Sequence, residues 1–129
     1  MRKIMLFVAI AAGMCHAAVT PLDQATLKEY LTRGAPFDFI LIDVRTPEEV
    51  TAAIGSETCK PYNLPWPDPF MQEVAKIPKD QAIVVYCRSG SRSSRAAAYL
   101  SDNGYTRVYD AGGFLTWSGP TVSASDAKP

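Results

Sequence analysis

The chain has 129 residues, of which 47% are hydrophobic and 20% are charged, a composition typical of one globular domain. Its 13 basic and 13 acidic residues cancel, so the charge gives no reason to expect a nucleic acid or a membrane surface as a partner. The sequence has no internal repeat and no cluster of metal-ligand residues, and we expect neither a metal nor a cofactor.

The first 17 residues have the pattern of a bacterial export signal. Arg2 and Lys3 form a positive start, and the apolar run at 4–14 is too short to span a membrane. Ala17 suits the last position before a cleavage site. We therefore expect a signal peptide at 1–17, a periplasmic or secreted protein, and no membrane contact after cleavage.

Cleavage at this point would change the set of reactive side chains. It would remove His16, the only histidine, so that the mature protein has no imidazole to act as a base or a metal ligand. It would also remove Cys15, which could otherwise carry a lipid anchor, although Met14 before it is a poor match to such sites. Two cysteines would remain, Cys59 and Cys87, in a compartment where disulfides form.

Helix and strand signals alternate from residue 20 onward. Thr20-Pro21 has the pattern of a helix start and Gly34 that of a helix end, which predicts a first helix between them. The apolar run at 39–42 predicts a buried strand. Thr46 and Glu49 form a capping box, which predicts a short helix just after this strand.

The second half of the chain continues the alternation. Four prolines between 61 and 69 exclude regular structure across most of that stretch, and we expect the aromatic residues among them to pack on the rim of the domain rather than to form a polyproline ligand. A helix is predicted at 68–77, and a last strand at 107–109 leads into a flexible turn at Gly112-Gly113. From 118 to 129 the chain has little to bury, so we expect a disordered tail. This order predicts an α/β domain with a central parallel sheet and helices on both faces.

The most informative stretch, 81–103, has the pattern of a buried strand, a short loop and a helix. Cys87 begins the loop, where backbone N–H groups at a helix N-terminus favour a thiolate. Arg88 and Arg92 add positive charge that can hold an oxyanion in bidentate fashion, and Gly90 permits the turn. The alternative is a buried structural cysteine, which two arginines and a glycine so close to it disfavour.

These residues resemble the active-site loop of the rhodaneses, whose pattern is C-R-x-G-x-R, in the segment Cys87-Arg88-Ser89-Gly90-Ser91-Arg92. Three further motifs are similar to those of the family and follow the same order: Leu41–Arg45, Asn63–Pro65 and Gly112–Trp117. The resemblance spans residues 22–117. A lone cysteine and arginine at this spacing would be a weak signal, whereas four motifs in order are a strong one.

One segment of the chain departs from the family pattern. At 53–62 the chain lacks the histidine-containing turn usual in the family, so the path of this segment and the position of Cys59 cannot be carried over.

Asp43 and Arg45 end a strand at the sheet edge where open α/β sheets place their sites. We expect these two residues to support the cysteine loop without taking part in the chemistry; the alternative is a surface ion pair of little energetic value.

The resemblance implies a rhodanese-like domain at 18–117 and a thiosulfate sulfurtransferase, closest to the small periplasmic rhodaneses of the phage-shock type. Cys87 would attack the outer, sulfane sulfur of thiosulfate, release sulfite and carry a persulfide until a thiol or cyanide accepts the sulfur. The substrate-binding residues would be Arg88, Ser89, Gly90, Ser91, Arg92 and Ser93. We expect a monomer that acts on a small anionic sulfur donor.

Two other functions stay open for a thiolate in an anion-binding loop. Phosphatases and arsenate reductases of the C-x5-R type need one more residue before the arginine than Cys87 and Arg92 provide. A sulfur-carrier or thiol-redox module that uses Cys87 with Cys59 is the second alternative. We expect Cys59 instead to be a free or reversibly oxidised thiol, because a permanent disulfide would block the nucleophile.

Overall fold

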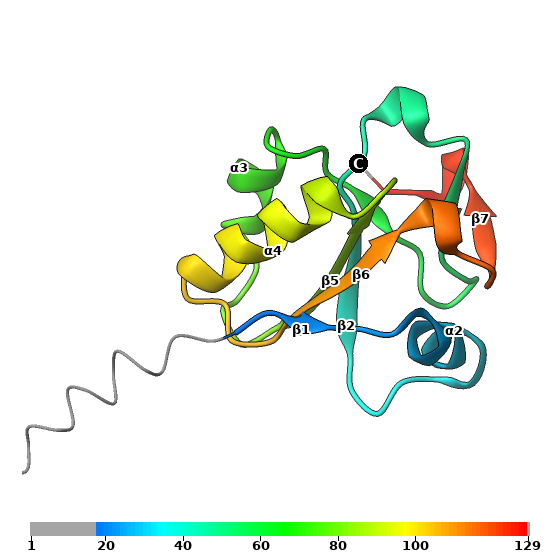
Figure 1. Ribbon diagram of the computed structural model, residues 1–129, viewed down its shortest axis with the longest axis horizontal. Coiled ribbons are helices and arrows are strands. Elements are labelled where there is room, and N and C mark those ends of the chain that lie inside the picture. Colours follow the sequence, from blue (N-terminus) through cyan, green and yellow to red (C-terminus); the bar gives the residue numbers. More distant parts are fainter. Residues whose placement is uncertain (1–17, 129) are drawn as a thin grey trace, which may run out of the picture.

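The computed structural model describes residues 18–128, and the predicted signal peptide at 1–17 lies outside these described residues. The described chain forms a five-stranded parallel sheet with the strand order β1-β6-β5-β2-β4 (Figure 1). Its strands are β1 (Thr20–Pro21), β2 (Phe39–Asp43), β4 (Tyr62–Asn63), β5 (Ala82–Cys87) and β6 (Val108–Gly113). Two further strands, β3 (Ala52–Ile54) and β7 (Thr121–Ser123), pair antiparallel beside this sheet.

Helices cover both faces of the sheet, with α2 (Gln24–Arg33) on one face and α3 (Phe70–Val74) and α4 (Ser91–Asp102) on the other (Figure 1). The central strand β5 is buried along its whole length, so its side chains alternate between two cores. Val84 packs in the core under α2, and Val85 packs in the core under α4. The predicted α/β fold with helices on both faces is therefore confirmed.

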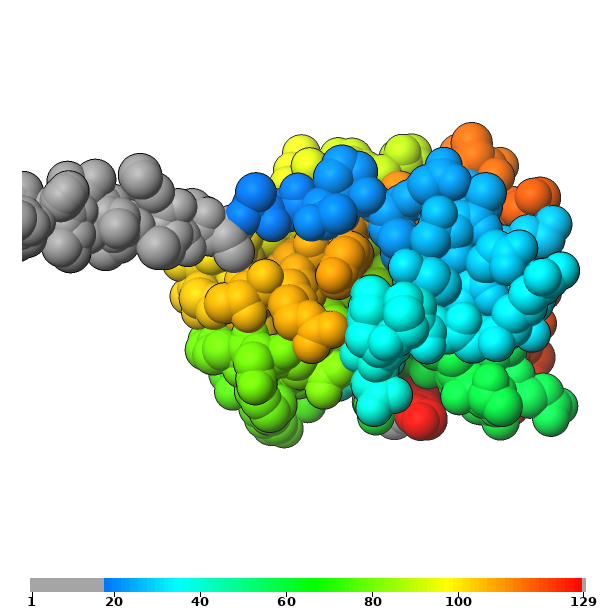
Figure 2. Space-filling view, turned by 90° about the horizontal axis from the view of Figure 1, so that it is seen from below, coloured from blue at the N-terminus to red at the C-terminus, as the bar shows by residue number. Residues whose placement is uncertain are grey.

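The prediction that Thr20-Pro21 begins a helix is wrong. These two residues form β1, which pairs in parallel with β6, and Figure 2 shows this blue segment lying against the orange strand region. Leu22 extends the contact by donating its N–H to the carbonyl of Asp110 at 2.9 Å. The helix α2 begins only at Gln24 and ends at the predicted Gly34, whose φ of 101° lies in the left-handed region.

The prediction of a disordered tail from residue 118 is also wrong for the part of it that the structure describes. The strand β7 pairs with β3, and a parallel bridge joins Tyr62 to Lys128. The indole N–H of Trp117 donates to the carbonyl of Pro120 at 2.9 Å, which fixes the chain just before β7. The prediction rested on how few apolar side chains this segment has to bury. It failed because backbone pairing with β3 holds the segment in place.

Two smaller differences concern the middle of the chain. The helix predicted at 68–77 is shorter, since α3 covers only its centre, although a hydrogen-bonded turn continues to Ile77. The unassigned segment 53–62 contains the end of β3 and a loop in which Ser56 and Cys59 exchange backbone hydrogen bonds at 3.0 and 3.2 Å. Among residues 18–128, no helix has the length and apolar character needed to cross a membrane.

Candidate active site

Cys87 is the last residue of the central strand β5, at the carboxyl edge of the sheet, and it is buried. Its Sγ accepts hydrogen bonds from the backbone N–H of Gly90 at 3.0 Å and from that of Ser93 at 3.3 Å. Gly90 has a φ of 105°, which disfavours any side chain, and this turn lets α4 begin at Ser91. Two N–H groups at a helix N-terminus thus face the sulfur, an arrangement that stabilises negative charge on it.

The end of β6 packs against the backbone of the cysteine loop. Cys87 pairs with Gly113, and a Cβ added to Gly113 would lie 2.3 Å from the carbonyl oxygen of Arg88. The same carbonyl accepts the N–H of Leu115 at 3.1 Å. The prediction of a flexible turn at Gly112-Gly113 is therefore wrong: these glycines end a strand, and Gly113 is required because two backbones approach closely.

The other predicted binding residues surround Cys87 with different exposures. Arg88, Ser89 and Ser91 are exposed, Arg92 is partly buried, and Ser93 is fully buried. The Ser93 hydroxyl donates to the carbonyl of Gly90, and the backbone N–H of Ser93 donates to the Cys87 sulfur. In the described part of the chain, no group of three His, Cys, Asp or Glu side chains is arranged to hold a metal ion.

Arg92 is held by a residue that sequence reasoning did not assign to the site. Its Nη1 donates to Oε1 of Glu49 at 2.6 Å, and its Nη2 donates to Oε2 at 2.9 Å. These bonds lower the pKa of Glu49 to about 2 and raise the pKa of Arg92, so the pair is ionised at neutral pH. Glu49 also accepts the backbone N–H of Thr46 at 2.9 Å, as the predicted capping box requires. The capping box explained the glutamate fully, and its separation of 43 positions from Arg92 left no local signal of the contact.

Asp43 and Arg45 form a second ion pair, which is buried at the end of β2. Their Oδ2 and Nη2 atoms lie 2.6 Å apart, and the side chains are 0% and 3% exposed. The Arg45 guanidinium also donates to the carbonyl of Ala52 at 2.8 Å and lies 4.6 Å from the centre of the Phe114 ring. The pair joins β2, β3 and the segment after β6, so the alternative of a surface ion pair is wrong.

Cys59 lies far from Cys87 along the sheet. It lines a cavity of about 190 Å³ together with Phe39, the first residue of β2. Phe39 pairs with Ala82, and the five residue steps from Ala82 to Cys87 span roughly 16 Å of strand. Both cysteines are free, and a disulfide needs Cα atoms within about 7 Å. The structure therefore does not support the alternative of a thiol-redox module that uses Cys87 with Cys59. Burial raises the pKa of the Cys59 thiol.

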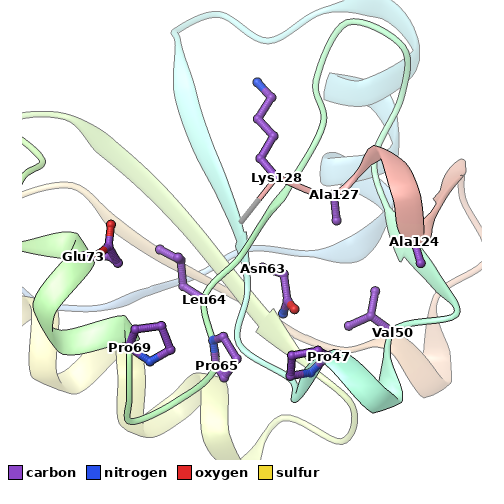
Figure 3. A pocket seen from close by; sticks show the side chains of 10 residues that line it. All are labelled: Pro47, Val50, Asn63, Leu64, Pro65, Pro69, Glu73, Ala124, Ala127 and Lys128. Carbon is purple, nitrogen blue, oxygen red and sulfur yellow. The ribbon is translucent and has the colours of Figure 1, made fainter.

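A pocket of about 670 Å³ lies beside the turn that carries Glu49 (Figure 3). Pro47 and Val50, on either side of Glu49 in the sequence, line it, and the C-terminal segment 124–128 contributes Ala124, Ala127 and Lys128. No residue of the loop 87–93 lines this pocket. The pocket is thus a neighbour of the cysteine site and not the place where Cys87 would meet a substrate.

Comparison with known proteins gives a consistent result. Residues 23–119 match the family described as the rhodanese-like domain. The chain is 35% identical over 102 residues to a sulfurtransferase of Allochromatium vinosum, and the match covers 78% of this chain and 89% of that protein. It is 34% identical over 87 residues to the thiosulfate sulfurtransferase PspE of Escherichia coli, covering 63% of this chain and 76% of that one. A solved structure described as rhodanese with anions from Escherichia coli matches with a TM-score of 0.57 and 30% identity, covering 67% of this chain and 99% of that chain.

Proposed function

The chain belongs to the rhodanese-like domain family, and we propose that it is a thiosulfate sulfurtransferase that carries sulfur as a persulfide on Cys87. The observation that supports the proposal most is the Cys87 sulfur itself, which faces the N–H groups of Gly90 and Ser93 at the start of α4. Relatives named as sulfurtransferases support sulfur transfer in general. Relatives named as thiosulfate sulfurtransferases support thiosulfate as the donor.

In the first half-reaction, the Cys87 thiolate attacks the outer sulfur of thiosulfate. A bond forms between the two sulfurs, the sulfur–sulfur bond of thiosulfate breaks, and sulfite leaves with the electron pair. Charge is conserved, since a thiolate and a dianion become an anionic persulfide and a sulfite dianion. No proton moves in this step, so it needs no histidine or other general acid.

In the second half-reaction, a thiol in the form of its thiolate, or cyanide in an assay, attacks the outer sulfur of the persulfide. The Cys87 thiolate leaves with the electron pair and is restored. The N–H groups of Gly90 and Ser93 are preorganised for the anionic sulfur that stands at the beginning and the end of each cycle.

The charged side chains of the loop have a binding role in this proposal. Arg92 is partly buried and interacts electrostatically with Cys87, so it is the cation best placed to receive the sulfonate end of the donor. Arg88 is exposed and adds charge that attracts anions from solution. Asp43 and Arg45 act only as supports, because both are occupied with each other in the protein interior.

We further propose that the protein is exported and acts as a monomeric periplasmic or secreted enzyme of the phage-shock type. The support for export is the pattern of the first 17 residues, with Arg2 and Lys3 before an apolar run at 4–14. The protein PspE of Escherichia coli, a thiosulfate sulfurtransferase, is among the relatives. N-terminal sequencing of the protein isolated from a bacterial periplasm tests this directly, with residue 18 as the expected first residue.

Replacing the nucleophile tests the activity. We expect Cys87→Ser to abolish thiosulfate:cyanide sulfur transfer with an unchanged circular dichroism spectrum, because a serine hydroxyl is not ionised at neutral pH and cannot hold a persulfide. Cys59→Ser is the matched control and should keep its activity, since Cys59 lies at the other end of the sheet. Activity retained in Cys87→Ser would show that another group is the nucleophile.

A further inference from the structure

The arginine that should receive the donor is already bound to a carboxylate of the same chain. Glu49 and Arg92 form two charge-assisted hydrogen bonds, at 2.6 and 2.9 Å, and their side chains are 29% and 27% exposed. The Glu49 carboxylate is held in place from its own side by the N–H and the hydroxyl of Thr46, at 2.9 and 3.1 Å. It is thus a fixed negative group beside the site and not a mobile surface side chain.

This contact leaves Arg92 only partly available. A guanidinium has five N–H donors, and Glu49 occupies two of them, so three remain for other acceptors. The positive charge of Arg92 is offset by the carboxylate beside it. An anion that approaches Arg92 therefore gains its hydrogen bonds while it is repelled by Glu49, and a dianion is repelled about twice as strongly as a monoanion.

We propose that Glu49 is a specificity-determining residue, which holds Arg92 in position and competes with the anionic group of the incoming reagent for the same guanidinium. The cysteine site consequently disfavours anionic reagents relative to neutral ones, and dianions more than monoanions, compared with what the arginines of the loop alone would allow. This inference rests on the proposed function where it concerns sulfur donors, but its main test does not depend on turnover.

The neighbouring Glu48 gives a matched control. It carries the same charge one residue away on the same short helix, η1 (Pro47–Glu49), and it is exposed, whereas the bonds to Arg92 come from Glu49. Both Glu49→Gln and Glu48→Gln remove one negative charge at almost the same place. Glutamine also suits the third position of a capping box, so Glu49→Gln keeps the acceptor for the Thr46 N–H.

The test is the alkylation of Cys87 by two reagents of similar size, iodoacetate, which is an anion, and iodoacetamide, which is neutral. Because Cys87 is buried, both reagents need the same opening of the site, and the ratio of their rates cancels this common step. Mass analysis of the Cys87 peptide separates its alkylation from that of Cys59. We expect Glu49→Gln to raise the iodoacetate-to-iodoacetamide ratio by about three- to tenfold and Glu48→Gln to change it much less.

Two results would overturn the proposal. An equal rise in both variants would mean that only the net charge of the surface matters. A fall of the ratio in Glu49→Gln would mean that Glu49 merely supports Arg92 and does not compete for it.

Steady-state kinetics with thiosulfate separates this proposal from the proposed function. We expect Glu49→Gln to lower the KM for this dianion, relative to Glu48→Gln, with a smaller change in kcat. An unchanged or raised KM contradicts competition for Arg92. If wild type fails to turn over thiosulfate at all, the proposed donor is wrong, and the alkylation ratio still decides the role of Glu49.

Discussion

Two arginine–carboxylate pairs flank the Cys87 loop, and they differ in nearly every physical respect. Asp43 and Arg45 are neighbours in sequence, are 0% and 3% exposed, and are occupied with each other. Glu49 and Arg92 lie 43 residues apart and are both more than a quarter exposed, with Arg92 in the loop itself. The first pair is enclosed in the protein interior, whereas the second lies where an anion from solution can approach it.

The largest expected effect comes from breaking the buried pair. Arg45→Ala leaves the Asp43 carboxylate buried without its main partner, so we expect a loss of about 3–5 kcal/mol in the free energy of unfolding. Urea denaturation measures it. The double variant Asp43→Leu/Arg45→Met is the control and should be more stable than Arg45→Ala, because no uncompensated charge remains. A loss under about 1 kcal/mol in Arg45→Ala would show that the pair behaves like a surface contact.

Breaking the second pair should affect binding more than stability. Arg92→Ala removes charge-assisted hydrogen bonds worth about 1.5–3 kcal/mol each to a bound anion, so we expect the KM for thiosulfate to rise by roughly ten- to a hundredfold. The free energy of unfolding should fall by less than it does in Arg45→Ala, since the pair is partly exposed. Among Arg45 and Arg92 variants that stay folded, a larger KM effect at Arg45 would reverse the assignment of the two arginines.

The charged and neutral forms of the Glu49 side chain can also be reached by changing the pH. The folded protein holds the pKa of Glu49 at about 2, below its ordinary value of 4.5, mainly through the bonds from Arg92. A lowered pKa means that the stabilisation is complete above about 4.5 and is lost as the pH falls toward 2. We expect the difference in urea midpoint between wild type and Glu49→Gln to stay constant from about pH 8 to 5 and to shrink below that range. A difference that already shrinks within that range would contradict the lowered pKa.

The smallest effect is expected far from both pairs. Cys59→Ser should keep most of the sulfurtransferase activity, because Cys59 lies beside Phe39 at the opposite end of the sheet from Cys87. Wild type should be active without added reductant for the same reason. If wild type is inert until it is reduced while Cys59→Ser is active throughout, the two cysteines react with each other and Cys59 cannot stay at the far end of the sheet.

The sequence predicted the parts of the fold that have strong local signals. The apolar runs of β2 and β5, the loop after Cys87 and the helix end at Gly34 all depend on residues close together in the chain. The two-residue strand β1 is too short for any pattern, and Thr20-Pro21 also suits a helix start, so the prediction failed there. The strand β7 was missed because its partner β3 lies about 70 residues earlier.

The residues of the candidate site likewise fall into two groups, those with a local sequence signal and those that only the fold brings together. The proposed nucleophile and the arginines of the loop are local and could be identified from residues 87–92 alone. The contact of Glu49 with Arg92 and the close approach of Gly113 to Arg88 depend on the fold bringing distant segments together. Gly113 was identified as part of a family motif, but only the packing of two backbones explains why the position must be glycine.

The central claim is that Cys87 accepts a sulfur atom, and intact mass spectrometry tests it most directly. After incubation with thiosulfate and removal of the excess, we expect wild type and Cys59→Ser to gain the mass of one sulfur atom and Cys87→Ser to gain none. Cyanide should then remove the added mass with the formation of thiocyanate. No mass gain in wild type, or a gain that maps to Cys59, would contradict the account.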